Sequence, residues 1–514
     1  MTPPSPTSGI VYLIGAGPGD PGLLTLRAAE LIASADVVLY DYLVHPDILQ
    51  HAPPTAELIY VGKKAKQHTL PQGGINELLV EKARAGRRVV RLKGGDPYVF
   101  GRGGEEAQEL AAAGIAFEVV PGITSGIAGP AYAGIPVTHR EFNTSVTFIT
   151  AHEDPTKGES TLNWKALAAM AEHGTLVFYM GVERLRALTG MLSKEGADPK
   201  LPVSIIRWGT LGRQTSLHGD LSTIAEIAEK AGMKPPALTV VGRVNRLRET
   251  LNWFEHRPLF GRRIVVTRTR EQASRLSREL RILGAEVLEI PTIRIEPAPP
   301  GARELDNLQN FSEFYDWLVF TSPNGVTHFF DLYFRHHPDI RKLGPVRIAT
   351  VGPATATALA EYRLQSDLTP RTYTTEALGE AFRNHDLHGQ RMCLARSQLA
   401  NPQLSADLKN LGAHVEEWSV YQTVPENEDL LGKHQDYLEN GADYVTFTSS
   451  STVENWVRLD LKPPENRSPV HASIGPVTSE TLRQLNLPVN FEAATHTIPG
   501  LIEAILQHAT QPIP

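Results

Sequence analysis

The sequence contains one cysteine in 514 residues, Cys393. A single thiol forms no intramolecular disulfide, so a disulfide-stapled scaffold is excluded and a reducing compartment is expected. Long apolar runs are also missing, because stretches such as Val37–Tyr40 are far shorter than the roughly 20 residues that cross a bilayer. Residues 1–9 lack the basic start of a signal peptide. We expect a cytoplasmic protein with a flexible tail at residues 1–9 and no membrane partner.

Several motifs of metal and nucleotide chemistry are absent as well. The 18 histidines include no His-Glu-x-x-His motif and no paired Cys/His spacing, so no metal site is predicted. There is no Gly-x-Ser-x-Gly elbow and no Gly-x-x-x-x-Gly-Lys-Ser/Thr loop, which disfavours the commonest hydrolases and NTPases. Cys393 falls in a strand-like run, Gln390–Ala395, and is expected to be a small buried hydrophobe.

The composition is that of a globular protein, with 41% hydrophobic and 21% charged residues. At about 100–200 residues per domain, the length predicts several domains. The net charge is −7, yet residues 63–102 carry ten basic and three acidic side chains. A basic stretch in an acidic chain favours a small polyanionic substrate over nucleic acid, which usually recruits a whole basic face. Solvated helix and strand ends are the alternative interpretation.

Strand-like and helix-like runs alternate along the first half, which predicts α/β layers with mostly parallel strands. A second α/β block is expected after Thr138, a linker at Asn252–Pro258, and a fresh strand at Arg263–Thr267. The expected strands before the linker are Ile10–Gly15, Val37–Tyr40, Arg88–Lys93, Phe117–Val120, Ser145–Thr150, Thr175–Tyr179, Val203–Ile206 and Ala237–Val241.

The second half repeats itself. Phe-Thr-Ser at 320–322 recurs at 447–449, and Gly-Ala at 284–285 recurs at 412–413. Two copies are too few for a solenoid, but they suit a two-lobed protein with a cleft between similar α/β lobes.

Glycine loops follow three strands of the first half. Residues 15–20 (Gly-Ala-Gly-Pro-Gly-Asp) stand between a strand and a helix, but Asp20 and Pro18 fit a dinucleotide fingerprint poorly, since Pro18 lacks an N–H for a pyrophosphate. NAD binding, a structural turn, and an uncharged or zwitterionic nucleoside all remain open. Further glycine loops lie at 93–104 and 121–125. Ligands gather where parallel strands end, although tight turns are the alternative explanation.

Residues 10–250 resemble the uroporphyrinogen-III C-methyltransferases. The matching stretches are Val11–Leu26, Ala35–Asp41, Val61–Lys64, Arg91–Gly104, Val120–Thr124, Tyr132–Arg140 and Leu176–Gly181. Residues 261–503 resemble uroporphyrinogen-III synthase, through Phe320–Gly325, Val351–Ala356, Tyr421–Thr423, Phe447–Ser451 and Ile474–Thr478. The resemblance implies a tetrapyrrole-methylase-like two-subdomain α/β fold (about 10–138 and 139–250), a linker at 251–260, and a two-lobed α/β synthase-like fold over 261–514.

For the first half, the resemblance implies methylation of uroporphyrinogen III at C2 and C7 to precorrin-2, toward siroheme or cobalamin. The implied cofactor is S-adenosyl-L-methionine, with S-adenosyl-L-homocysteine as product. It carries no phosphate, so Pro18 and Asp20 are acceptable, and the eight carboxylates of the substrate suit the basic stretch. A homodimer through this half is expected.

The family's proton acceptor and donor fall on Asp41 and Lys63, although Asp41 is also open to a plain strand-end capping role. Arg91 and Arg102 are expected to bind substrate. The implied cofactor contacts are Pro18, Gly94, Gly95, Asp96, Val99, Thr124, Ser125, Met180 and Gly209. The chain departs from the family pattern at Tyr42, where Arg is usual, and at residues 206–210.

For the second half, the resemblance implies closure of hydroxymethylbilane with inversion of ring D, without a metal. Tyr421 matches the tyrosine that would protonate the leaving hydroxyl. Substrate carboxylates would be bound by Thr321, Ser322, Thr355, Ser449, Ser450 and Thr478. Helix capping is the alternative role for each of these hydroxyls. A non-catalytic tetrapyrrole-binding module is the alternative for this half, and an NAD-dependent dehydrogenase is disfavoured by Pro18 and Asp20.

Overall fold

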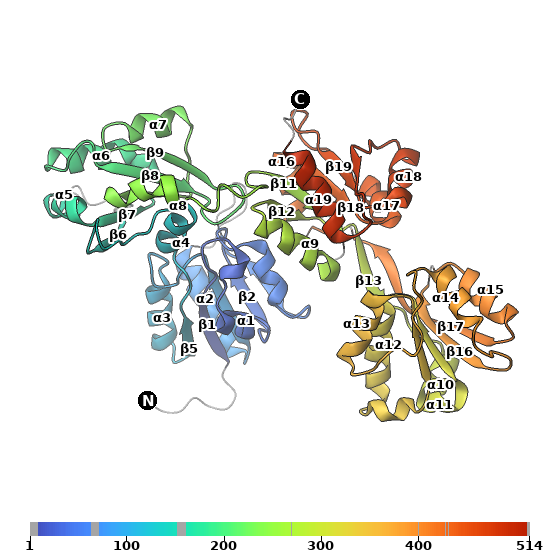
Figure 1. The fold of residues 1–514 in the computed structure, drawn as a ribbon. Helices are drawn as coiled ribbons and strands as arrows, with labels where there is room; N and C mark the ends of the chain where they lie inside the picture. Colours follow the sequence, from blue (N-terminus) through green and yellow to red (C-terminus); the bar gives the residue numbers. More distant parts are fainter. Residues whose placement is uncertain are drawn as a thin grey trace.

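The computed structural model describes residues 9–62, 71–151, 161–268, 270–398, 400–426, 428–429 and 431–510. Lys63 and nearly all of the expected tail lie outside these ranges. Within them the strands form four five-stranded sheets, two in each half of the chain (Figure 1). Helices pack against these sheets, so the expected α/β class is confirmed. Among the described helices, none has both the length and the apolar character to span a bilayer.

The first sheet is parallel throughout, in the order β3-β2-β4-β1-β5. Hydrophobic clusters pack on both of its faces, which explains why its inner strands are nearly continuous apolar runs. The strands are β1 (Ile10–Gly15), β2 (Val37–Tyr40), β3 (Glu57–Tyr60), β4 (Arg88–Lys93) and β5 (Ala116–Val120). The helical segments are η1 (Pro21–Leu23), α1 (Leu26–Ile32), η2 (Pro46–His51), α2 (Gln72–Arg84) and α3 (Gly103–Ala112).

The second sheet, in the order β6-β7-β10-β8-β9, corrects the expectation of mostly parallel strands. Only β6 and β7 run parallel in it, because β8 and β9 are joined by a short connection that permits an antiparallel pair. Its strands are β6 (Val146–Thr150), β7 (Thr175–Tyr179), β8 (Pro202–Arg207), β9 (Thr215–Asp220) and β10 (Ala237–Val241). The helical segments are α4 (Ser125–Tyr132), α5 (Trp164–His173), η3 (Val182–Arg184), α6 (Leu185–Lys194), α7 (Ile224–Lys230), η4 (Arg243–Leu247) and α8 (Arg248–Leu251).

The third sheet, in the order β12-β11-β18-β19-β20, is again parallel. Its strands are β11 (Arg263–Val266), β12 (Glu286–Glu289), β18 (Tyr444–Phe447), β19 (Val470–Ser473) and β20 (Phe491–Glu492). Its helices are α9 (Arg270–Ile282), α16 (Lys433–Asn440), α17 (Ser450–Leu459), α18 (Pro476–Gln484) and α19 (Ile498–Ala509).

The fourth sheet, in the order β13-β17-β16-β14-β15, is parallel except for β13. Its strands are β13 (Ile293–Pro297), β14 (Trp317–Phe320), β15 (Arg347–Thr350), β16 (Arg391–Ser397) and β17 (His414–Pro425). The helical segments are α10 (Ala302–Gln309), α11 (Phe311–Phe314), α12 (Pro323–His336), η5 (Ile340–Leu343), α13 (Pro353–Glu361), α14 (Thr375–Phe382) and α15 (Gln403–Asn410). Cys393 is buried in β16, as expected.

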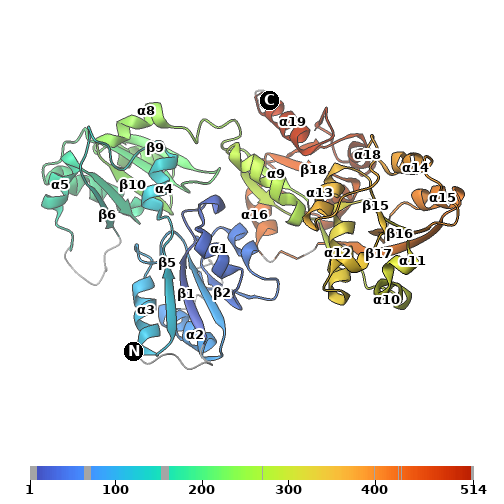
Figure 2. The same cartoon turned by 60° about the horizontal axis from the view of Figure 1, so that its bottom comes forward.

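The two sequence copies of the second half do not correspond to its two sheets. The first copy supplies β11 and β12 to the third sheet and then β14 and β15 to the fourth, and the second copy supplies strands in the reverse order. The chain therefore crosses between the sheets twice. Both ribbon views place the third sheet beside the first half and the fourth sheet farther away (Figures 1 and 2).

Candidate active sites

The carboxyl ends of β1, β4 and β5 bring the three glycine loops together at one edge of the first sheet. Gly17 and Gly95 exchange two backbone hydrogen bonds, of 3.1 and 2.7 Å. A Cβ atom on Gly15 would lie 2.5 Å from the Cα atom of Gly122, so any side chain there would force the two loops apart. Backbone therefore forms this wall, as expected for a ligand site where parallel strands end.

Asp96 ties these loops to one another. Its carboxylate accepts N–H bonds from Tyr98 at 2.8 Å, Val99 at 3.2 Å and Gly122 at 3.0 Å. The predicted cofactor residues Gly94, Gly95, Asp96, Val99, Thr124 and Ser125 thus belong to one connected loop cluster. Asp96 organises the backbone of this cluster.

The same cluster continues into the second sheet. The hydroxyl oxygens of Thr124 and Tyr179 lie 2.7 Å apart, and the Gly126 N–H donates to the Tyr179 oxygen at 2.9 Å. Burial raises the pKa of Tyr179, so its proton is retained as a hydrogen-bond donor. Met180, which follows it, is 51% exposed in a left-handed conformation with φ of 56°. The predicted contact at Met180 is therefore available to a ligand.

The loop that contains Pro18 packs against the loop after β8. The Asp20 N–H donates to the Thr210 hydroxyl at 2.9 Å, while the Asp20 carboxylate accepts from the Tyr132 hydroxyl at 2.8 Å. Gly209, in the loop after β8, packs against α4, since a Cβ atom on it would lie 3.0 Å from the Cα atom of Gly129. A loop with a proline and a carboxylate suits a cationic sulfonium nucleoside better than a diphosphate.

Asp41 stands at the end of β2 and remains partly open, with its side chain 25% exposed. Its carboxylate accepts the Leu43 N–H at 3.1 Å, so the capping role is real. It also lies 3.6 Å from the guanidinium of Arg91. The acid is therefore held both by the loop and by a buried cation, which leaves a carboxylate oriented at the edge where the glycine loops meet.

Arg91, which was expected to bind substrate, is almost completely buried. It is 4% exposed, and its Nε atom lies 3.3 Å from Glu106, which is fully buried and also takes Lys93 at 2.8 Å. Burial lowers the pKa of Lys93, with the Arg91 charge adding to the effect. Arg91 thus contacts the predicted base Asp41 from the buried side. Arg102, in contrast, has a 56% exposed side chain.

Within residues 71–102, the described part of the basic stretch, most of the positive surplus is neutralised in space. Acids from outside that stretch pair with its bases: Glu57 with Lys82 at 2.8 Å, Asp36 with Arg88 at 3.4 Å, and Glu105 with Arg102 at 2.5 Å. A free basic face is therefore not built from the described part of this stretch.

Sequence reasoning missed a contact between the two departures from the family pattern. Tyr42, 55% exposed, meets Trp208 edge-on with ring centroids 6.0 Å apart. The guanidinium of Arg213 lies 4.3 Å above the Trp208 ring. The departures themselves were visible in the sequence, but no local pattern says that residues so far apart touch. The buried role of Glu106 was also missed, because acidic residues are common in the first turn of a helix and its sequence position shows nothing else.

In the second half, Tyr421 and Ser322 meet at the carboxyl edge of the fourth sheet. Their hydroxyl oxygens lie 3.0 Å apart, and the ring of His328 stacks on Tyr421 at 5.7 Å. Tyr421 is 8% exposed, and Ser322 also accepts the Gly325 N–H to cap α12. Tyr421, the predicted general acid, therefore has the Ser322 hydroxyl as a partner and is largely shielded from solvent.

The other predicted hydroxyls are divided between the two sheets. Thr321 and Thr355 lie with the fourth sheet, whereas Ser449, Ser450 and Thr478 lie with the third. Ser449 caps α17, so capping is confirmed for it as it is for Ser322. Thr355, Ser450 and Thr478 occupy the first turns of helices that follow parallel strands, where backbone N–H groups favour anions, and Thr321 directly precedes the N-cap residue of α12.

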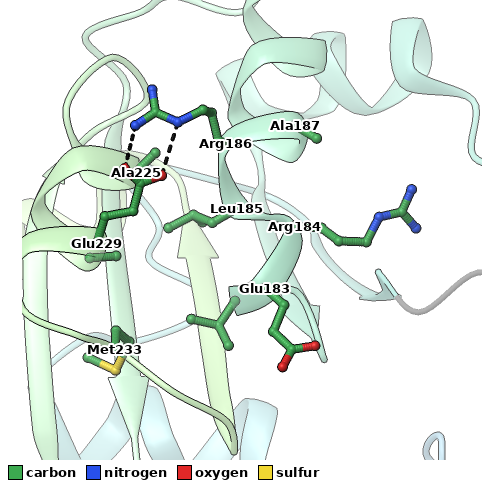
Figure 3. Close-up of a pocket in the computed structure, with 10 residues that line it drawn as sticks. Glu183, Arg184, Leu185, Arg186, Ala187, Ala225, Glu229 and Met233 are labelled. Atoms are coloured by element: carbon green, nitrogen blue, oxygen red, sulfur yellow. Dashed lines mark hydrogen bonds and ion pairs between the residues drawn. The ribbon is translucent and has the colours of Figure 1, made fainter.

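A hollow of about 660 Å³ between α6 and α7 lies apart from these residues (Figure 3). Arg186 and Glu229 form an ion pair of 2.6 Å along its wall. It contains none of the predicted site residues and no strand end with a glycine loop. We therefore assign the chemistry to the sheet edges.

Comparison with known proteins finds a different match for each half. Residues 10–225 match the family model of tetrapyrrole (corrin/porphyrin) methylases, and residues 274–503 match that of uroporphyrinogen-III synthase HemD. Over 97% of its length the chain is 38% identical to a Ruminiclostridium josui protein described as porphyrin biosynthesis protein HemD, 98% of which is covered.

Over 47% of its length the chain is 57% identical to the S-adenosyl-L-methionine-dependent uroporphyrinogen III methyltransferase of Methanosarcina barkeri, with 94% of that protein covered. A solved structure, uroporphyrin-III C-methyl transferase from Thermus thermophilus complexed with S-adenyl homocysteine, is 41% identical. The match covers 46% of this chain and 100% of that one, with a TM-score of 0.40.

Proposed function

The chain belongs to the family of porphyrin biosynthesis proteins that join a tetrapyrrole methylase to a HemD-type uroporphyrinogen-III synthase, and from this premise we propose how its residues divide the work. It is a bifunctional enzyme of tetrapyrrole synthesis. The second half closes hydroxymethylbilane to uroporphyrinogen III, and the first half methylates that product to precorrin-2. The convergence of three glycine loops beside Asp41 is the observation that best supports the methylating site.

The cofactor is S-adenosyl-L-methionine, which supplies a methyl group on a sulfonium. The proposed cradle is the backbone of the loops at Gly94–Asp96 and Thr124–Ser125, with Pro18, Val99, Met180 and Gly209 around it. Asp41 takes the proton that the methylated carbon releases, and Arg91, whose guanidinium lies 3.6 Å away, orients its carboxylate. Arg102 binds a substrate carboxylate at the surface. Lys63 is proposed as proton donor on the resemblance alone.

In the second half, Tyr421 donates a proton to the leaving hydroxyl of the bilane. Ser322 orients the phenol, because its hydroxyl lies within hydrogen-bond distance. Thr321, Thr355, Ser449, Ser450 and Thr478 bind substrate carboxylates together with the helix N-termini on which they lie. We propose boundaries of 10–250 for the methyltransferase, with subdomains meeting near residue 138, and 261–514 for the synthase.

A homodimer through the first half is also proposed. Ile127 on α4 is 47% exposed and Trp253 is 45% exposed, and the Trp253 indole N–H donates to the carbonyl of Ala131, one turn along α4. Such an apolar patch is typical of an interface between copies. Light scattering after chromatography is the test: we expect a dimer for the wild type and a monomer for Ile127→Glu.

One anaerobic incubation tests both activities. The purified protein receives hydroxymethylbilane and methyl-labelled S-adenosyl-L-methionine, and the products are resolved by mass and by isomer. Two added methyl groups on a type III macrocycle are expected. Unmethylated type III would contradict the methyltransferase assignment. Only type I, the product of spontaneous closure, would instead mean that the second half binds tetrapyrroles without catalysis.

A further inference from the structure

The loop that carries Trp208 is packed directly against the synthase half. The Gly261 N–H donates to the Gly212 carbonyl at 3.0 Å, and a Cβ atom on Gly212 would lie 2.2 Å from the backbone nitrogen of Glu286. Arg213, stacked on Trp208, also lies 3.5 Å from the Glu286 carboxylate. Close backbone packing and an ion pair therefore both connect this loop to the start of β12.

The segment that follows Asp41 is attached to the same half at a second point. Asp47, in η2, is 8% exposed, and its carboxylate binds Lys433 at 2.5 Å and Arg281 as well. Nearby, the Gln50 amide donates to Glu289 at 3.1 Å. These synthase residues lie on α9, β12 and α16, which all belong to the unit built on the third sheet.

The two attached segments flank the proposed methylation site. Tyr42 is next to the base Asp41, Trp208 is next to the proposed cofactor contact Gly209, and the two rings meet. An exposed tyrosine, a tryptophan and the cation of Arg213 are the chemistry that suits a macrocycle of electron-rich pyrrole rings with carboxylate side chains. Movement of either segment would therefore shift Tyr42 or Trp208 relative to Asp41, and with them the surface on which such a substrate would lie.

We propose that the third-sheet unit of the synthase half forms part of the substrate-binding apparatus of the methyltransferase half, by holding the Trp208 loop and the Asp41–Asp47 segment in place. Arg213, Glu286 and Asp47 are then positioning residues for methyl transfer. Glu286 and Asp47 contact no reacting group, and Glu286 belongs to the synthase half. The inference rests on the proposed function of the first half.

The test supplies uroporphyrinogen III directly to the full-length protein, so that methylation is measured without cyclisation. Glu286→Gln removes the ion pair that holds Arg213 without adding a cation that would attract the substrate carboxylates. We expect it to raise the KM for uroporphyrinogen III about fivefold, with kcat and the KM for S-adenosyl-L-methionine within about twofold. Glu286→Asp keeps the charge and should retain the wild-type KM. Glu229→Gln, which removes an exposed ion pair with Arg186, is the matched control.

Synthase activity on hydroxymethylbilane is measured in the same preparations. Glu286 opens β12, at the edge of the third sheet opposite Ser449, which follows the end of β18, so cyclisation should stay within about twofold. Should Glu286→Gln lose cyclisation too, Arg213→Gln on the methyltransferase side replaces it.

An unchanged KM for uroporphyrinogen III in Glu286→Gln and Arg213→Gln would overturn the inference, as would an equal loss of affinity for uroporphyrinogen III and S-adenosyl-L-methionine. In both cases methylation by the wild type would still support the proposed function. Failure of the wild type to methylate uroporphyrinogen III would instead overturn the proposed function itself.

Discussion

A single buried carboxylate supports the proposed methylation site. Glu106 is fully buried, and its Oε1 atom takes Lys93, Arg91 and the amide of Gln72. Asp41 is the second acid within reach of Arg91, so two cations are balanced by two carboxylates. Charges removed from water in this way are costly unless each has its partner.

Replacement of Glu106 by Gln should therefore destabilise the protein. The change leaves two buried cations with one nearby acid, and we expect the free energy of unfolding to fall by about 3–5 kcal/mol. Chemical denaturation followed by circular dichroism measures it. Glu105→Gln is the neighbouring control, since the pair of Glu105 with Arg102 is exposed and its loss should cost less than about 1 kcal/mol. Equal losses in the two variants would contradict the buried-charge account.

Tyr421→Phe removes one hydroxyl and leaves the ring in its packing. We expect the kcat of cyclisation to fall about 10²-fold, the typical contribution of a positioned general acid. Tyr333→Phe is the matched control: Tyr333 is a buried tyrosine of the same hydrophobic cluster whose hydroxyl donates to the Asp339 carbonyl. A similar loss in both variants would indicate disturbed packing rather than lost proton donation.

At the scale of elements, η2 connects the methylating edge to the synthase half. His45 caps this short helix, and its Nδ1 atom accepts the Asp47 N–H at 3.2 Å. Burial lowers the pKa of His45; Lys433 and Arg281 lower it further, and Asp47 and Glu286 act in the opposite direction. The ring is therefore neutral in the fold.

This neutral histidine predicts a pH dependence of stability. Below the ordinary histidine pKa of about 6.5, His45 of the unfolded chain binds a proton that His45 of the folded chain does not bind. The free energy of unfolding therefore decreases as the pH is lowered, by up to about 1.4 kcal/mol per pH unit. Denaturation at several pH values between about 5 and 7 measures the slope. His45→Asn, which keeps a capping acceptor, should be less steep than the wild type. Identical slopes would exclude His45 as the source.

At the scale of the whole molecule, the two activities should be separable by single changes. Asp41→Asn removes the proposed base and is expected to stop the pathway at unmethylated type III product. Tyr421→Phe is expected to shift the product toward type I, because slow catalysed closure competes with spontaneous closure. Supplied uroporphyrinogen III should still be methylated by Tyr421→Phe. Product analysis by mass and isomer distinguishes these outcomes, and type III yield unchanged in Tyr421→Phe would contradict its role.

Local sequence was sufficient for several strands and for the loops that end them. β1, β2, β4, β7 and β10 have the expected bounds, because short β-branched and apolar runs between glycine loops pair in few other ways. β9 escaped prediction, since its sequence Thr-Ser-Leu-His-Gly-Asp is that of a polar edge strand. The meeting of the three glycine loops, which we propose as the cofactor site, could be predicted because a parallel sheet gathers its strand ends at one edge.

Contacts between residues distant in the chain depended on the fold. Arg91, which the sequence led us to expect as a substrate-binding residue, is buried against Glu106, and the Asp47 carboxylate pairs with Lys433 of the other half. Charge neutralisation acts through space, so a count along the chain cannot reveal it. The residue types, their spacing and the family were therefore accessible from sequence, whereas partners, burial and the contact between the halves required three dimensions.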